Sequence, residues 1–114
     1  MIAVIFEVRP EAGQKDRYLD LAGKMRPLAE QIDGFISVER FASLTEEGKL
    51  LSLSFWRDEA ALDEWRRLSR HRAMQTLGRS ELFEGYRLRI AGVIRDYGME
   101  DRDEAPADSR ALHG

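Results

Sequence analysis

The chain opens on a regular alternation of apolar and polar positions. Ile2, Val4, Phe6 and Val8 fall on one side of residues 2–9, and because successive side chains of a strand point to opposite faces, this spacing predicts a β-strand. From about Ala12 to Ile32 the apolar residues instead recur every three or four positions. That period predicts an amphipathic helix with one face toward a core.

Breaks in the pattern predict where these elements end. Pro10 and Gly13 close the first strand, Pro27 predicts a kink in the helix, and Asp33-Gly34 predicts the helix stop. Strand-like segments at 35–44 and 49–56 flank a turn at 45–48, which predicts a hairpin.

The second half of the chain predicts one more helix and one more strand. Asp58 is a suitable N-cap for a helix that continues to about 77–78, with a possible break near Ser69. A last strand is expected over about residues 85–97. The order β-α-β-β-α-β predicts an α+β, ferredoxin-like domain over residues 1–98, with an antiparallel four-stranded sheet in which the first and last strands are neighbours.

Both helices of such a domain cover the same face of the sheet. The strands nevertheless carry apolar side chains toward both faces, as Ile5 beside Phe6 illustrates. We therefore predict a homodimer in which a second copy covers the bare face.

Charge sets residues 99–114 apart from this domain. The tail has five acidic and two basic residues and contains Pro106 but no apolar period, so it is predicted to be disordered. Since the whole chain has a net charge of −3, the domain itself is near neutral, and we expect no binding to nucleic acid. His113 lies in the tail and is interpreted as incidental.

Composition removes several further classes of function. The chain has no cysteine, which excludes disulfides and thiolate metal sites. No apolar run approaches the roughly 18 residues of a membrane span, and the N-terminus lacks a basic leader, so we expect a cytoplasmic protein that does not enter the membrane. No two histidines have metal-ligand spacing, and no glycine-rich phosphate motif is present.

Candidate chemistry gathers between Ser52 and Arg72. The arginines around His71 disfavour its protonation, so a neutral imidazole there could accept a proton. Trp65 could form a flat wall for an aromatic ligand. The structural alternatives are a partly exposed polar His71 and a core Trp65 in line with Leu62.

Charged residues also fall within the predicted strands. Glu7 lies on the first strand, and Arg87 and Arg89 lie on the last, so the structural interpretation is a cross-strand ion pair. If the pair lined a cavity, an arginine could stabilise an oxyanion. Phe83 joins Glu7 and Trp65 as a candidate substrate-binding residue.

Three features resemble the antibiotic biosynthesis monooxygenase family of dimeric α+β barrels, over about residues 1–98. They are the run FWRDEAAL at residues 55–62, Gly34-Phe35 after the first helix, and Trp65 followed by His71. Characterised members either oxidise polyphenolic aromatics with dioxygen and no cofactor, or cleave haem. The resemblance places the family's pocket tryptophan at Trp65, its polar pocket residue at His71 and its polar strand-one position, within one residue, at Glu7.

The resemblance implies a cofactor-independent monooxygenase or oxidase of an aromatic, enolisable small molecule. His71 would then be the proton acceptor, Trp65 the pocket wall and Arg87 or Arg89 the anion stabiliser. This chain has no asparagine, a residue that both characterised branches use. The alternatives are a non-catalytic, small-molecule-binding or stress-related dimer, and a haem-binding or haem-degrading monooxygenase.

Overall fold

The structure, a computed structural model, describes the backbone of residues 1–77 and 82–114 and the side chains of residues 1–70 and 82–114. Its elements are β1 (Ile2–Pro10), α1 (Lys15–Glu30), β2 (Phe35–Ala42), β3 (Leu50–Trp56), α2 (Glu59–Leu77), β4 (Phe83–Gly92) and α3 (Ala107–His113). The first six confirm the predicted β-α-β-β-α-β order.

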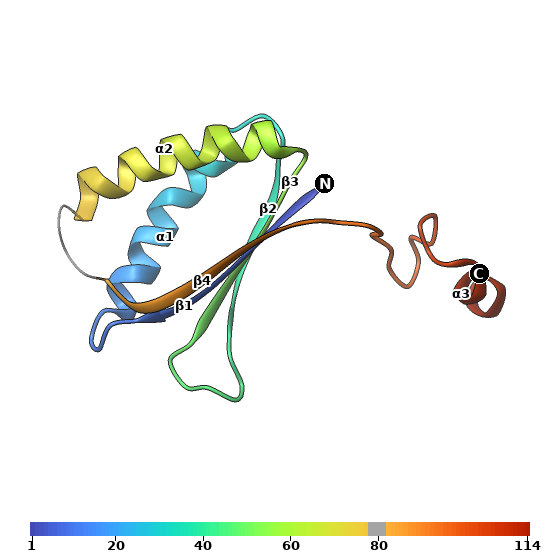
Figure 1. Ribbon diagram of the computed structural model, residues 1–114, viewed down its shortest axis with the longest axis horizontal. Coiled ribbons are helices and arrows are strands. Elements are labelled where there is room, and N and C mark those ends of the chain that lie inside the picture. Colours follow the sequence, from blue (N-terminus) through green and yellow to red (C-terminus); the bar gives the residue numbers. More distant parts are fainter. Residues whose placement is uncertain (78–81) are drawn as a thin grey trace.

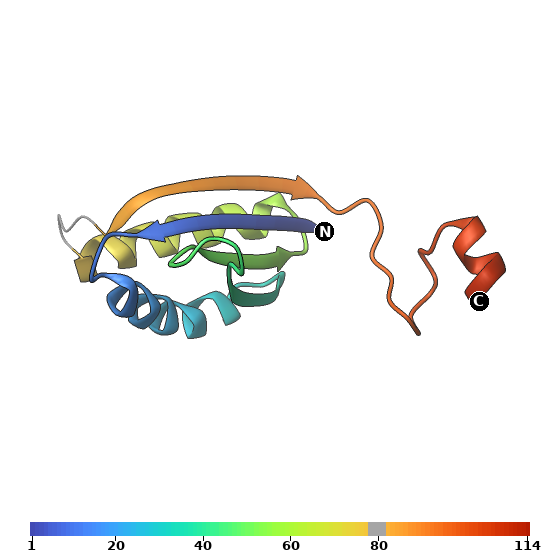
Figure 2. The same cartoon turned by 90° about the horizontal axis from the view of Figure 1, so that it is seen from below.

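The strands form one antiparallel sheet in the order β2-β3-β1-β4, so β1 and β4 are neighbours as predicted. Both long helices lie on one face of this sheet, and the other face is open (Figures 1 and 2). None of the helices in the described ranges is long and apolar enough to cross a bilayer.

The core between helices and sheet consists of two clusters of buried residues. One is centred on Trp56 and contains Ala29, Ile32, Ala61 and Leu62. The other contains Val8, Tyr18, Leu50 and Leu82. Because each strand contributes every second side chain to this face, β1 and β3 supply residues to both clusters.

The junction of α1, β3 and α2 is fixed by Gly34 and its neighbours. Gly34 has a positive φ of 97°, and its carbonyl accepts a 2.7 Å hydrogen bond from the backbone N–H of Arg57. Asp58 caps α2, because its carboxylate accepts a 2.9 Å hydrogen bond from the Ala61 N–H. That bond, together with the Arg57 guanidinium, lowers the pKa of Asp58. The predicted N-cap is confirmed. The helix stop predicted at Asp33-Gly34 was placed too late, because α1 ends at Glu30 with Gln31 as its C-cap and Gly34 instead belongs to the turn that leads into β2.

Two further boundaries and one predicted break were also wrong. The first helix starts at Lys15 because a turn intervenes, in which Gln14 N–H donates to the Glu11 carbonyl at 2.8 Å. The last strand covers Phe83–Gly92. It ends opposite the first residue of β1, because the strands are antiparallel and Gly92 pairs with Ile2. The predicted break near Ser69 is absent: α2 is continuous, and the Ser69 hydroxyl donates to the Arg66 carbonyl at 3.3 Å within the helix.

The segment after β4 leads away from the sheet (Figures 1 and 2). It contains a short helix, α3, and a turn in which Arg102 donates to the Gly98 carbonyl at 3.1 Å and lies 5.2 Å from the Tyr97 ring centroid. The disorder expected from residue 99 stays a prediction. This projecting arm explains a radius of gyration of 16.7 Å, compared with roughly 13 Å for a compact chain of this length.

The face of the sheet opposite the helices carries apolar side chains along its two central strands. By strand register, Ile5 of β1 lies opposite Leu53 of β3, with Phe55 on the same face. At the sheet's edge Phe41 is 42% exposed. A bare face of this kind is typical of a surface that a second chain covers.

We therefore expect sedimentation at micromolar concentration to give about twice the 13.1 kDa of one chain. Leu53→Glu places a charge at the centre of the bare face and should yield a folded monomer by circular dichroism. Leu112→Glu, at a site 79% exposed in α3, should remain dimeric. A folded, monomeric unmodified protein would contradict the dimer.

Gly34 also predicts a stability effect. A Cβ at this position would lie 2.8 Å from the Ala61 Cβ in a backbone conformation that other residues rarely adopt, so Gly34→Ala should cost about 2–4 kcal/mol in urea unfolding. Gly23→Ala is the matched control, because a Cβ there meets nothing within 4 Å and should stabilise α1 by about 0.5–1 kcal/mol. Equal effects of the two substitutions would show that the junction tolerates a side chain.

Candidate functional site

A cavity of about 280 Å³ lies between α2 and the helix-facing side of β1, β3 and β4. Its floor and walls are mostly apolar. Val4, Phe6, Leu62, Leu88 and Ile90 line it together with Ser52, Ser54, Trp65, Arg66 and Ser69. The volume is close to the lower end of the roughly 300–1,000 Å³ typical of small-molecule sites, so the cleft suits a molecule of one or two rings.

The sequence of β3 explains why a cavity remains here. Its helix-facing positions are Leu50, Ser52, Ser54 and Trp56, and the two outer residues are buried in different core clusters. The two serines between them are too small to fill the space under α2. Small polar residues at inward positions of a strand were the sequence signal for the cavity, and the sequence analysis missed it.

Trp65 forms the wall of this cleft on α2. Its ring stacks on Trp56, with centroids 5.9 Å apart and planes at 23°, and it packs against the core cluster around Trp56. The Trp56 indole N–H donates in turn to the Ser54 hydroxyl at 3.0 Å. Trp65 is therefore both a core residue and a cavity residue, so the two sequence interpretations of it are compatible.

A smaller recess of about 70 Å³ adjoins the cleft and shares Ser52, Ser54 and Trp65 with it. Arg40 of β2 lines this recess, opposite Ser52 in the strand register. A charged residue at a helix-facing strand position was a second signal that the sequence analysis missed.

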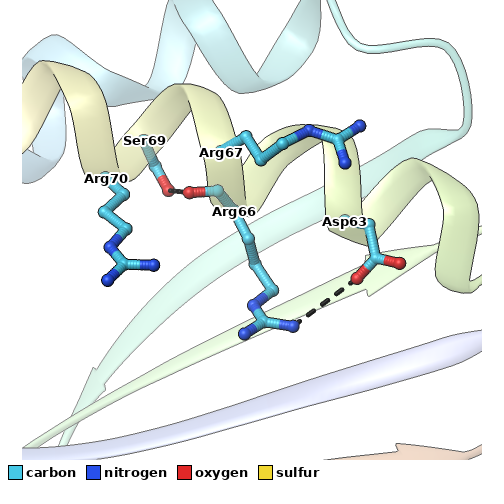
Figure 3. Close-up of a pocket in the computed structure, with 5 residues that line it drawn as sticks. All are labelled: Asp63, Arg66, Arg67, Ser69 and Arg70. Atoms are coloured by element: carbon cyan, nitrogen blue, oxygen red, sulfur yellow. Dashed lines mark hydrogen bonds and ion pairs between the residues drawn. The ribbon is translucent and has the colours of Figure 1, made fainter.

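Arginines of α2 mark the outer side of the cleft. Arg66 and Ser69 line the cleft and also a shallow surface pocket that includes Arg67 and Arg70. In Figure 3, Arg66 extends from α2 toward the strands, whereas Arg67 runs along the helix. Arg66 makes a 3.5 Å ion pair with Asp63 and is 63% exposed, so its guanidinium remains accessible to a ligand.

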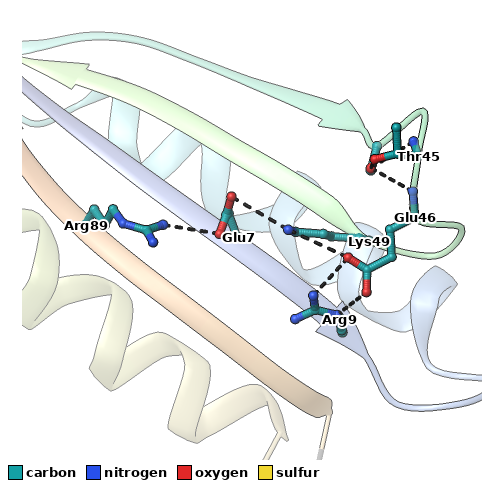
Figure 4. Close-up of polar contacts among 7 residues, drawn as sticks. Glu7, Arg9, Thr45, Glu46, Lys49 and Arg89 are labelled. Atoms are coloured by element: carbon teal, nitrogen blue, oxygen red, sulfur yellow. Dashed lines mark hydrogen bonds and ion pairs between the residues drawn. The ribbon is translucent and has the colours of Figure 1, made fainter.

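Glu7 lies on the opposite face of the sheet from this cleft. Its neighbour Val8 is fully buried in the cluster beneath α1, and successive strand residues face opposite ways. Arg89 donates to the Glu7 carboxylate at 3.2 Å, and Lys49 lies 3.7 Å from its other oxygen (Figure 4). The predicted cross-strand ion pair is therefore present, and neither of its residues lines the cleft.

The charged network continues from Glu7 to the β2–β3 loop. Glu46 lies 3.7 Å from Lys49 and accepts two hydrogen bonds from Arg9, at 2.6 and 2.8 Å. The hydrogen bond from Arg9 lowers the pKa of the Glu46 carboxyl, although partial burial acts in the opposite direction. Three cationic and two anionic side chains are thus paired in one network on the face that we expect a partner to cover.

The structure divides the sequence candidates between the two faces. Trp65 lines the cleft, whereas Glu7, its cross-strand partner Arg87, and Arg89 lie on the other face. No single cavity can use both groups. The resemblance placed the family's strand-one position only to within one residue, and a shift of one residue moves a side chain to the other face of the sheet. Phe6, which lines the cleft, occupies the adjacent inward position.

The two remaining candidates have different outcomes. Phe83 packs edge-on against Phe6 and Tyr18, with centroids 5.9 and 5.7 Å apart, so it supports the cleft wall from behind. The side chain of His71 lies outside the described residues. Since α2 is continuous, about 100° per residue places position 71 about 240° around the helix from Trp65.

The described lining of the cleft offers no axial ligand for a haem iron, and the described residues form no metal-binding cluster. Histidine, cysteine, methionine and tyrosine, the usual axial ligands of haem iron, are absent from the described lining of the cleft. Across the described part of the chain, no three metal-ligating side chains come together. We therefore derive no step through either group.

Comparison with known proteins identifies the family of this chain. Residues 1–77 match the family model for antibiotic biosynthesis monooxygenase. A protein of Pyricularia oryzae named jasmonate monooxygenase ABM is 48% identical over 93 residues, which are 82% of this chain and 43% of that protein. This chain thus spans less than half the length of that relative.

Solved structures of low sequence identity share the fold. A MhuD mutant with two manganese protoporphyrin IX molecules per active site superposes with a TM-score of 0.70 at 16% identity, over 86% of this chain and 99% of that one. A mutant of SnoaB, a cofactor-independent oxygenase from Streptomyces nogalater, gives 0.66 at 9% identity, over 83% and 94%. With the family match over most of its ferredoxin-like domain, this chain belongs to the antibiotic biosynthesis monooxygenase family.

Proposed function

We propose that this chain is an oxygenase that binds a small, enolisable ring compound in the cleft under α2 and oxidises it with dioxygen, without a cofactor. The observation that supports this most is the cleft itself, an apolar cavity with an aromatic wall, Trp65, and a cation, Arg66, at its rim. Apolar walls hold a flat ring, and Leu88 and Ile90, which are 49% and 45% exposed, leave the cleft open on the side of β4.

The chemistry needs little from the protein because the substrate supplies all the electrons. Loss of a proton from an activated CH₂ group gives an enolate, whose carbon bonds to dioxygen to form a peroxide. Loss of the second proton with cleavage of the O–O bond then gives a ketone and water. One oxygen atom enters the product and the other leaves as water, so CH₂ plus O₂ balances C=O plus H₂O.

We assign to Arg66 the role of stabilising the enolate. A guanidinium at the rim stabilises negative charge on the enolate oxygen, which lowers the pKa of the substrate C–H. The described lining of the cleft contains no carboxylate or imidazole, so we propose that the proton passes to water at the rim. The fungal relative's name supports an oxygenase role, while its substrate, jasmonate, is one compound to test here.

Oxygen uptake is the direct test. With anthrone as the probe and no added metal, flavin or reductant, the protein should consume one O₂ for each anthraquinone formed, with one atom of ¹⁸O₂ in the product. Jasmonate is assayed in parallel by oxygen uptake and product mass. Uptake no faster than spontaneous oxidation of both probes would refute the oxygenase and favour a non-catalytic binding protein. A new Soret band on addition of haemin would favour the haem alternative.

Three substitutions on α2 then separate the roles of its side chains. Arg66→Gln should lower kcat/KM at least tenfold, because the rim loses its cation, whereas Arg67→Gln, which removes an arginine outside the cleft, should stay within twofold. His71→Ala should also stay within twofold, given the position of residue 71 around the helix. A loss of 100-fold or more in the His71 variant would instead identify His71 as the general base.

A further inference from the structure

Arg40 has a buried hydrogen-bond donor that nothing in the described structure satisfies. Its Nε is enclosed, yet it has no hydrogen-bond partner. No acidic side chain within the described ranges forms an ion pair with Arg40. A buried N–H of a charged group without a partner is costly, and a bound water or ligand can complete such a group.

The surroundings of Arg40 favour an anion as that ligand. The recess that it lines also contains Ser52 and Ser54, whose hydroxyls can donate hydrogen bonds, and no acidic residue. Arg26 lines the same recess, but its Nε donates to Glu30 at 3.2 Å, so its charge is already compensated. Arg40 is thus the guanidinium here with bonding capacity left, and guanidinium groups bind carboxylates in a fork geometry.

Size distinguishes the recess from the main cleft. At about 70 Å³ the recess is one quarter of the size of the main cleft. The smaller and charged end of a ligand, such as a carboxylate, suits this space better than a ring does. The adjoining 280 Å³ is apolar and has room for rings, and Ser52, Ser54 and Trp65 belong to both spaces.

We propose that Arg40, with Ser52 and Ser54, forms a carboxylate-binding subsite, and that the ligand of this protein is therefore an organic acid with an apolar ring body. The ring lies against Trp65 in the main cleft, and the carboxylate reaches past it to Arg40. This inference rests on the proposed ligand cleft but not on oxygen chemistry, so binding can test it separately from turnover.

The test compares an acid with its own ester. Binding of jasmonate and methyl jasmonate, and of 1-naphthylacetate and its methyl ester, is measured by isothermal titration calorimetry on the full chain. The unmodified protein should bind at least one acid 10-fold or more tightly than the matching ester. Arg40→Gln should weaken binding of that acid 10- to 100-fold, as expected for a lost charge-assisted bond, and should leave binding of the ester within twofold.

Two further variants control for charge and folding. Arg67→Gln removes one positive charge from α2 outside both cavities and should leave acid binding unchanged. Arg40→Lys should recover part of the acid affinity, because it restores the charge but not the fork. If Arg40→Gln does not fold, Ser52→Ala should still weaken binding of the acid more than that of the ester.

Any result without acid preference overturns the subsite, whether both members of each pair bind equally or neither binds. Equal weakening of acid and ester by Arg40→Gln would also overturn it, since that pattern indicates a packing role. Oxygen uptake is scored independently: an acid-selective protein that consumes no oxygen would refute the proposed function and leave the carboxylate subsite standing.

Discussion

The burial of Trp56 is the constraint on which the rest of the structure depends. Only 1% of its surface is exposed, and its ring contacts Phe35 of β2 and Trp65 of α2. Burial of a tryptophan removes about 200 Å² from water, which contributes roughly 5 kcal/mol. This contact holds α2 over the sheet and orients Trp65, so the same packing that stabilises the fold also builds one wall of the cleft.

A cavity persists beside this contact because β3 cannot fill the space under the helix. Close packing normally leaves few voids in a protein interior. Here two serines stand between the two core clusters, and the protein forgoes apolar contacts that a leucine at either position would supply. A cavity retained at such a cost is more readily explained by a ligand than by stability.

In this account the sheet separates the proposed ligand site from the expected dimer interface, with one on each face. The helix-facing side holds the cleft, the recess and Arg40. The other side holds apolar residues and the compensated network from Arg89 to Arg9. Because these functions use alternate residues of the same strands, a substitution on one face can affect association while leaving the ligand site intact.

The fold could be predicted from the sequence, and most of the site could not. Element order and the cap at Asp58 follow from local patterns that short stretches of chain encode, and the adjacency of β1 and β4 follows from that order. The side of a strand on which a charged residue lies depends on a register of one residue, which is why Glu7 was assigned to the pocket. Ser52, Ser54 and Arg40 were missed because they line a common recess only when two strands, β2 and β3, meet both helices.

The central claim is that ligands bind on the helix-facing side of the sheet, against Trp65. A crystal structure of the protein soaked with an aromatic carboxylate tests it most directly. We predict electron density for the ring between Trp65 and the strand residues Leu88 and Ile90, with the carboxylate directed to Arg40. Density on the opposite face, beside Glu7 and Arg89, would contradict the account.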